Sequence, residues 1–160
     1  MNSLKYSRPA PRASTPSLFV LYWLPVALWM GFIFWMSTGT FSAENTSSVV
    51  EKVVTFLVPA ISSQELDLVH ALIRKAAHVT EYFILGLLLF RAFRGGSSAS
   101  WNGRWPFFAL IMVVLCAVSD ELHQSMIPTR EGSYVDVGID TAGGLLAQLV
   151  SVLRHCYRKK

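Results

Sequence analysis

Charged residues are scarce in this chain. Asp, Glu, Lys and Arg make up 15% of its 160 residues, whereas they make up about a quarter of an ordinary soluble domain. The hydrophobic fraction is 52%, and the mean hydropathy is +0.43. This balance is unusually apolar for a water-soluble domain of this size. It favours a membrane protein with the length of a single domain.

Several other features are rare or missing. Only two cysteines are present, Cys116 in an apolar run and Cys156 near the C-terminus, so a disulfide framework is not expected. The glycine-rich phosphate-binding motifs and the G-x-S-x-G nucleophile elbow are absent. The net charge of +4 comes without a nucleic-acid-binding motif. We therefore expect no nucleic-acid partner, and the basic clusters beside apolar runs are typical of orientation signals in membrane proteins.

Four apolar runs are present. The first, Leu18 to Thr38, contains no charged residue and is long enough to cross a hydrocarbon core of about 30 Å as a helix. It is also longer than the apolar core of a cleaved signal peptide. Further runs cover residues 76–93, 105–124 and 134–153, of which the last is the weakest because it includes two aspartates and a glutamine. The prediction is an all-α integral membrane fold with four transmembrane helices.

A mixed segment separates the first two runs. Apolar residues recur at helical spacing from Val49 to Leu57, which predicts an amphipathic helix that is too polar to span and lies in the membrane interface of the first extracytoplasmic loop. Pro59 should end it or follow its end closely. Ser62 with Glu65 three residues later has the pattern of a capping box. A helix is therefore expected to run from about Gln64 into the second apolar run.

The distribution of Lys and Arg predicts the orientation. Ten of the fourteen lie in the N-terminal tail, the 91–104 connection and the C-terminal tail, and four lie on the opposite side. Basic residues favour the cytoplasmic side, so both termini are expected there. The expected organisation is a flexible basic tail (1–17), one four-helix membrane domain (18–153) and a second basic tail (154–160).

With this orientation, polar residues of three helices gather near the outer face. At about 100° per residue, Arg74, His78 and Glu81 share one face of the second span, while Asp136 and Asp140 share a face of the fourth. Ionisable side chains at membrane depth cost free energy and usually mark function. The candidate catalytic residues are His78, Glu81, Asp120, Glu121 and His123. The candidate substrate-binding residues are Arg74, Lys75, Tyr82, Gln124, Arg130, Asp136 and Asp140.

The chemistry of this cluster has several interpretations. The polar groups could simply bond the helices to one another. His78 and Glu81, joined by Glu121 and His123, could form a mixed nitrogen and oxygen site for a divalent metal, although H-x-x-E is not a dedicated metal spacing and no cofactor is certain. Paired carboxylates beside a histidine also suit acid–base chemistry.

The basic residues around the cluster have two interpretations as well. Arg130 could bind a phosphate or carboxylate bidentately, with Lys75 adding a point charge. Alternatively, these cations could be ordinary interfacial anchors. His70 is expected to be only a surface residue of the mixed segment.

Three motifs occur in order along the chain. They are K-x-x-H-x-x-E-Y (Lys75–Tyr82), D-E-x-H-Q-x-x-x-P-x-R (Asp120–Arg130) and D-x-x-x-D-x-x-G-G (Asp136–Gly144). Together they resemble the VanZ-like family of small bacterial membrane proteins, named for an accessory protein of teicoplanin resistance. The resemblance covers about residues 75–150; the family commonly has Gly at the position of Thr129, and its Ser-rich end of the first span is only partly kept, as Ser37-Thr38-Gly39. It implies a bacterial plasma-membrane protein with a role in the cell envelope.

The expected function is recognition or modification of a membrane lipid or lipid-linked envelope precursor at the outer membrane face, linked to envelope homeostasis or teicoplanin-type resistance. One alternative is a small transporter or proton-coupled carrier, which requires polar groups that continue to the inner face. Below Asp140, the fourth span offers only Gln148. The other alternative is a non-catalytic membrane interaction partner. Enzymatic activity, the substrate and the oligomeric state are not fixed by the sequence.

Overall fold

The computed structural model describes residues 15–39, 43–97, 101–128, 130 and 132–157. These residues form helices α1 (Thr15–Met36), α2 (Ala43–Leu57), α3 (Ser63–Arg94), α4 (Arg104–Ser125) and α5 (Tyr134–Tyr157), and contain no strand. All except α2 are long and apolar enough to cross a membrane. The predicted all-α fold with four spanning helices is confirmed. The expected tails fall mainly on residues 1–14 and 158–160, which lie outside the described residues; at both ends the helices extend into the expected tails.

Helix α3 begins at a capping box, as the sequence predicts. Ser62 Oγ accepts a hydrogen bond from the Glu65 backbone N–H at 3.3 Å, and Glu65 Oε2 accepts one from the Ser62 N–H at 2.9 Å. The helix then continues for 32 residues and ends at Gly95, whose φ of 56° is readily adopted by glycine. At about 1.5 Å per residue, α3 is about 48 Å long, which exceeds the hydrocarbon thickness of about 30 Å.

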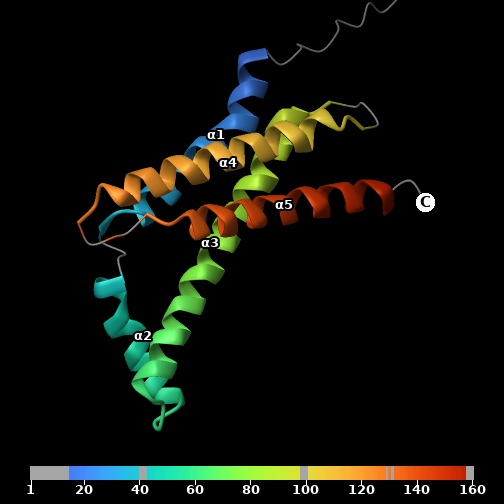
Figure 1. Ribbon diagram of the computed structural model, residues 1–160. Coiled ribbons are helices and arrows are strands. Elements are labelled where there is room, and N and C mark those ends of the chain that lie inside the picture. The colour runs from blue at the N-terminus through green and yellow to red at the C-terminus, as the bar shows by residue number, and fades with distance from the viewer. Residues whose placement is uncertain (1–14, 40–42, 98–100, 129, 131, 158–160) are drawn as a thin grey trace, which may run out of the picture.

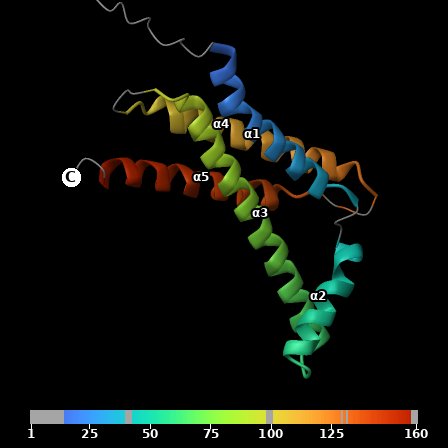
Figure 2. The same cartoon turned by 180° about the vertical axis from the view of Figure 1, so that it is seen from behind.

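The helices form a bundle from which one pair extends. Helices α4 and α5 run antiparallel, and α3 crosses them at a steep angle (Figure 1). The first half of α3, together with α2 beside it, extends away from the other helices in both views (Figure 2). Helix α2 ends before Pro59, as expected. Its position in a membrane interface stays a prediction.

Small residues allow α5 to pack closely on α3. A Cβ atom at Gly143 would lie 2.5 Å from the Val79 backbone oxygen, so only glycine permits the observed approach. Further along, Gly86 of α3 faces Ala147 of α5. The largest fully buried apolar side chains near this contact are Tyr82, Leu85, Leu89 and Val113.

Large apolar side chains cover the outside of the four long helices. At most 33% of each apolar stretch is buried within the protein. Leu28, Phe107 and Leu146, from three different helices, are examples of the exposed side chains. Soluble monomers rarely expose apolar surface this extensively. The outer faces of the bundle therefore suit a hydrocarbon environment.

Candidate functional site

The polar site begins with a contact between α3 and α5. His78 Nδ1 lies 3.0 Å from Asp140 Oδ1. His78 is 8% exposed and Asp140 is fully buried. The contact lies at the end of the small-residue face of α5, where Gly143 brings the two helices together. The sequence assigned both residues to the site but did not pair them.

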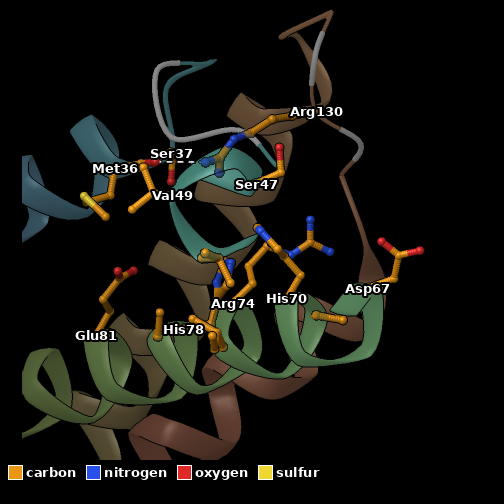
Figure 3. A pocket seen from close by; sticks show the side chains of 14 residues that line it. Met36, Ser37, Ser47, Val49, Asp67, His70, Arg74, His78, Glu81 and Arg130 are labelled. Atoms are coloured by element: carbon orange, nitrogen blue, oxygen red, sulfur yellow. Dashed lines mark hydrogen bonds between the residues drawn. The ribbon is translucent and has the colours of Figure 1, made fainter. Parts of the chain in front are cut away.

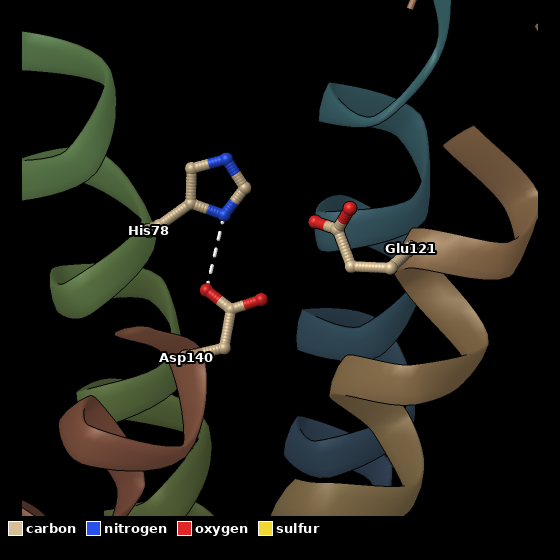
Figure 4. A group of neighbouring side chains, drawn as sticks. All are labelled: His78, Glu121 and Asp140. Atoms are coloured by element: carbon tan, nitrogen blue, oxygen red, sulfur yellow. Dashed lines mark hydrogen bonds and ion pairs between the residues drawn. The ribbon is translucent and has the colours of Figure 1, made fainter. Parts of the chain in front are cut away.

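Glu121 of α4 faces this pair. Its carboxylate Oε2 accepts a hydrogen bond from the Ser133 backbone N–H at 2.7 Å. The connection between α4 and α5 passes so close to α4 that a Cβ at Gly132 would lie 2.7 Å from the Glu121 backbone oxygen. The Glu121 carboxylate points toward His78 and Asp140 (Figure 4). One ligand atom from each of these three residues lies within 4.8 Å of the other two.

A second polar contact joins α4 to the end of α1. Asp120 is 1% exposed, and its two oxygens accept hydrogen bonds from Ser37 Oγ and from Gln124 Nε2. Both carboxylate oxygens therefore have partners. Ser37 was not among the predicted site residues, although it lies near the end of the first apolar run and belongs to the partly kept Ser-rich segment. Asp120 thus bonds α4 to the end of α1, and Gln124 supports its carboxylate from within α4.

The third polar contact joins α3 to the first turn of α5. Lys75 Nζ is 3.4 Å from Asp136 Oδ1, and the Lys75 side chain is 40% exposed. The Asp136 side chain is only 13% exposed, but because the lysine is partly in solvent the pair contributes little to stability, about 0–1 kcal/mol. Asp136 also faces the same side of α5 as Asp140, as the helical spacing predicted.

A pocket of about 600 Å³ lies between the first half of α3, α2, and the end of α1. Arg74, His78 and Glu81 enter it from α3, and Arg130 reaches it from the opposite side (Figure 3). Its other lining residues are mostly apolar; they include Met36, Val49, Val50, Ala71, Ile73 and Ala77. The volume lies in the range of small-molecule sites.

Two features of this pocket differ from the sequence interpretation. His70 lines it, so the expectation that His70 is only a surface residue is wrong. Helix α2 supplies one wall of the pocket through Val49 and Val50. The sequence did not indicate this contact, because an amphipathic pattern shows which face of a helix is apolar but not which element packs against it. Residues three or four positions apart share a helix face. The four-residue spacing of His70, Arg74 and His78 was therefore the signal that could have placed His70 on the same face of the helix as the site residues.

Arg130 connects the pocket to α1. Its Nη2 donates a hydrogen bond to the Met36 backbone oxygen at 3.0 Å. Burial lowers the pKa of the Arg130 guanidinium; the Asp120 carboxylate opposes this shift, and the positive charge of Arg74 adds to it. Arg74 and Arg130 are therefore close enough for their charges to interact.

Two predicted residues lie outside these contacts. The His123 ring packs against Phe34 of α1, with ring centroids 5.5 Å apart, and His123 is not in the group formed by His78, Glu121 and Asp140. Tyr82 is fully buried in the apolar core beside Leu85. Neither residue lines the pocket.

The polar residues on the buried face of α5 are interrupted between Asp140 and Gln148. Beyond Asp140, the buried face carries Gly143, Gly144 and Ala147 before Gln148 and Ser151. Gln148 Nε2 donates to the Gly86 backbone oxygen, and Ser151 Oγ donates to its own helix. Within the part of the chain that the structure describes, this packing disfavours a polar path for a carrier.

Comparison with known proteins identifies one family. The model of the VanZ/LLP1 family matches residues 20–155, a range that includes the polar site and the pocket. No curated protein and no solved structure matches the chain.

Proposed function

Since the chain belongs to the VanZ/LLP1 family and has four helices that suit a membrane, we propose that this multi-pass membrane protein recognises a lipid or lipid-linked envelope molecule with an anionic head group. One observation carries the proposal: Arg74 and Arg130, from separate elements, line the same pocket. Carboxylates nearby, Glu81 among them, partly offset the repulsion between these two cations, and a phosphate or carboxylate bound between the arginines would offset it further. Guanidinium groups bind such anions bidentately.

The remaining lining favours an amphiphilic ligand. Apolar side chains such as Met36, Val50 and Ile73 line the pocket beside the two arginines. A free inorganic anion would leave this apolar surface uncovered, whereas a lipid would place its head group at the arginines and part of its chain against the apolar wall. The site therefore matches both halves of a lipid.

Two further groups bear on whether the ligand is also modified. His78 and Glu81 line the pocket with the arginines, so a bound head group would lie beside an imidazole and a carboxylate. These are the side chains that acid–base modification of the head group would use. The proposal places the pocket on the outer side of the bacterial plasma membrane, with a role in envelope homeostasis or teicoplanin-type resistance.

Lipid retention tests this proposal. The protein is reconstituted with equal amounts of phosphatidylglycerol and phosphatidylcholine, and the lipids that remain bound are counted by native mass spectrometry. The parent protein should retain the anionic lipid preferentially. Arg74→Gln should weaken this retention by about tenfold, because a hydrogen bond to a charged group contributes about 1.5 kcal/mol or more.

Arg94→Gln is the matched control. It removes the same charge from the same helix, but at an exposed position at the far end of α3. This variant should retain anionic lipid like the parent. Equal losses in the two variants would mean that the arginines only anchor the helix ends to a charged membrane surface, and the proposed pocket would be wrong.

A further inference from the structure

Three buried side chains from three helices converge beside the pocket. His78 of α3, Glu121 of α4 and Asp140 of α5 are 8%, 5% and 0% exposed. A ligand atom from each lies within 4.8 Å of the others. Only His78 also lines the pocket, so this group is a separate site that shares one residue with it.

Two carboxylate oxygens in this group have no hydrogen-bond partner among the described residues. They are Glu121 Oε1 and Asp140 Oδ2, and both are buried. The second oxygen of Asp140 is turned toward Glu121 rather than toward the histidine (Figure 4). Buried polar groups are nearly always satisfied, and an unpaired buried carboxylate oxygen is costly. The arrangement therefore lacks a positively charged partner at its centre.

The surrounding structure orients the three side chains. Ser133 N–H fixes one oxygen of Glu121 and so directs the other into the group. The close packing at Gly143 sets the separation of α5 from α3, and with it the distance from Asp140 to His78. A hydrogen bond from an outer residue, such as the one from Ser133 to Glu121, is typical of metal sites, where it orients the ligand.

We propose that His78, Glu121 and Asp140 bind one divalent transition-metal ion, of the Mn²⁺ or Zn²⁺ type. An imidazole nitrogen with two carboxylate oxygens suits these ions better than Mg²⁺ or Ca²⁺, which prefer oxygen alone. Ligand bonds of about 2.1 Å place ligand atoms about 3.4 Å apart, so closure onto an ion requires side-chain shifts of about 1 Å. The two carboxylates balance the charge of the ion.

The ligand set differs from the one that sequence spacing suggested. Glu81 lines the pocket, and His123 packs against Phe34. Asp140 takes their place because α5 crosses α3 beside His78. The metal site requires no bound lipid and stands apart from the head-group proposal.

Metal binding by the purified protein in detergent, without added lipid, tests the inference. Protein prepared without chelators is analysed for metals by mass spectrometry, then stripped with a chelator and titrated with Mn²⁺ while the electron paramagnetic resonance of free Mn²⁺ is recorded. We expect one site per chain, with Zn²⁺ competing for it. Asp140→Asn and Glu121→Gln should each weaken Mn²⁺ binding by at least about tenfold, since loss of even an outer partner can have that effect.

Asp120→Asn provides the matched control. Asp120 is as deeply buried as the proposed ligands, but both of its oxygens have partners outside the group. This variant should bind Mn²⁺ like the parent. The proposal is overturned if the stripped parent, which is folded, takes up neither Mn²⁺ nor Zn²⁺ at one ion per chain. It is also overturned if Asp120→Asn loses as much Mn²⁺ affinity as Asp140→Asn.

Discussion

His78 Nδ1 and Asp140 Oδ1 are 3.0 Å apart, and this contact joins α3 to α5 through two residues that are 62 positions apart in the chain. It depends on the neighbouring turn of α5, where Gly143 lets the backbone of α5 approach Val79. The small residues and the polar residues of α5 therefore act together. The small residues set the distance between α5 and α3, and at that distance Asp140 can contact His78.

Replacing Gly143 should disturb this contact. In Gly143→Ala the new Cβ would lie 2.5 Å from the Val79 backbone oxygen, and a backbone atom cannot move aside as a flexible side chain can. We expect the free energy of unfolding to fall by about 1–3 kcal/mol, as for other overpacked sites. Thermal unfolding in detergent, followed by tryptophan fluorescence, measures the change.

Gly138→Ala is the control on the same helix. A Cβ at Gly138 meets nothing within 4 Å, and alanine favours helix by up to about 1 kcal/mol over glycine. This variant should be as stable as the parent or slightly more so. Equal stability of the Gly138 and Gly143 variants would contradict the described packing of α5 on α3.

Ser37→Ala should destabilise the link between α1 and α4. The substitution leaves Asp120 Oδ1 without its serine donor in a fully buried position. The expected cost is about 1–3 kcal/mol of unfolding free energy, because a buried acceptor loses its partner. Ser125→Ala is the comparison, since Ser125 Oγ donates only to its own helix at an exposed position. A midpoint of thermal unfolding that falls equally in both variants would refute the role of Ser37.

Much of the fold follows from local sequence. The length of each apolar run sets the extent of each spanning helix. The start of α3 is set by Ser62 and Glu65, because the side chain of each accepts a hydrogen bond from the backbone N–H of the other. The shared face of Asp136 and Asp140 follows from helical spacing alone. Features that depend on residues one or two turns apart were therefore predictable.

The pairing within the site was not predictable in the same way. His78 and Glu81 share a face of α3, yet His78 contacts Asp140 while Glu81 lines the pocket. Helical spacing gives the direction of each side chain but not the angle at which two helices cross. The contact of Ser37 with Asp120 likewise spans 83 positions. Such contacts depend on packing, which a single sequence does not reveal.

The orientation of the chain stays a prediction, and two single cysteines test it. The parent for this experiment carries Cys156→Ser, because Cys156 is exposed, and keeps the buried Cys116. Gly103→Cys adds a thiol where a Cβ meets nothing within 4 Å, and Met126→Cys adds one at a position that is 78% exposed. An impermeant thiol reagent applied to intact cells should label only position 126. Labelling of both positions from the same side would contradict the four-span topology. Labelling of position 103 alone would mean that the orientation is the opposite of the predicted one.

The last prediction concerns Arg130, whose guanidinium contacts Met36 and also lines the pocket. Its planar group carries several N–H donors, so one edge can bond the carbonyl at the end of α1 while another contacts a head group. Arg130→Lys keeps the positive charge but loses this geometry. A lysine can donate to Met36 or to the ligand, and it does not match an anion bidentately.

We therefore expect Arg130→Lys to retain anionic lipid about tenfold less well than the parent, while its unfolding free energy stays within about 1 kcal/mol. Arg130→Ala should lose both lipid retention and stability, because it also removes the bond to Met36. Arg154→Lys, at an exposed position near the end of α5, controls for the change of cation. If Arg130→Lys and Arg130→Ala both retain lipid like the parent, Arg130 does not bind the head group. If Arg130→Lys loses stability as Arg130→Ala does but retains lipid, the arginine serves only to fix the end of α1.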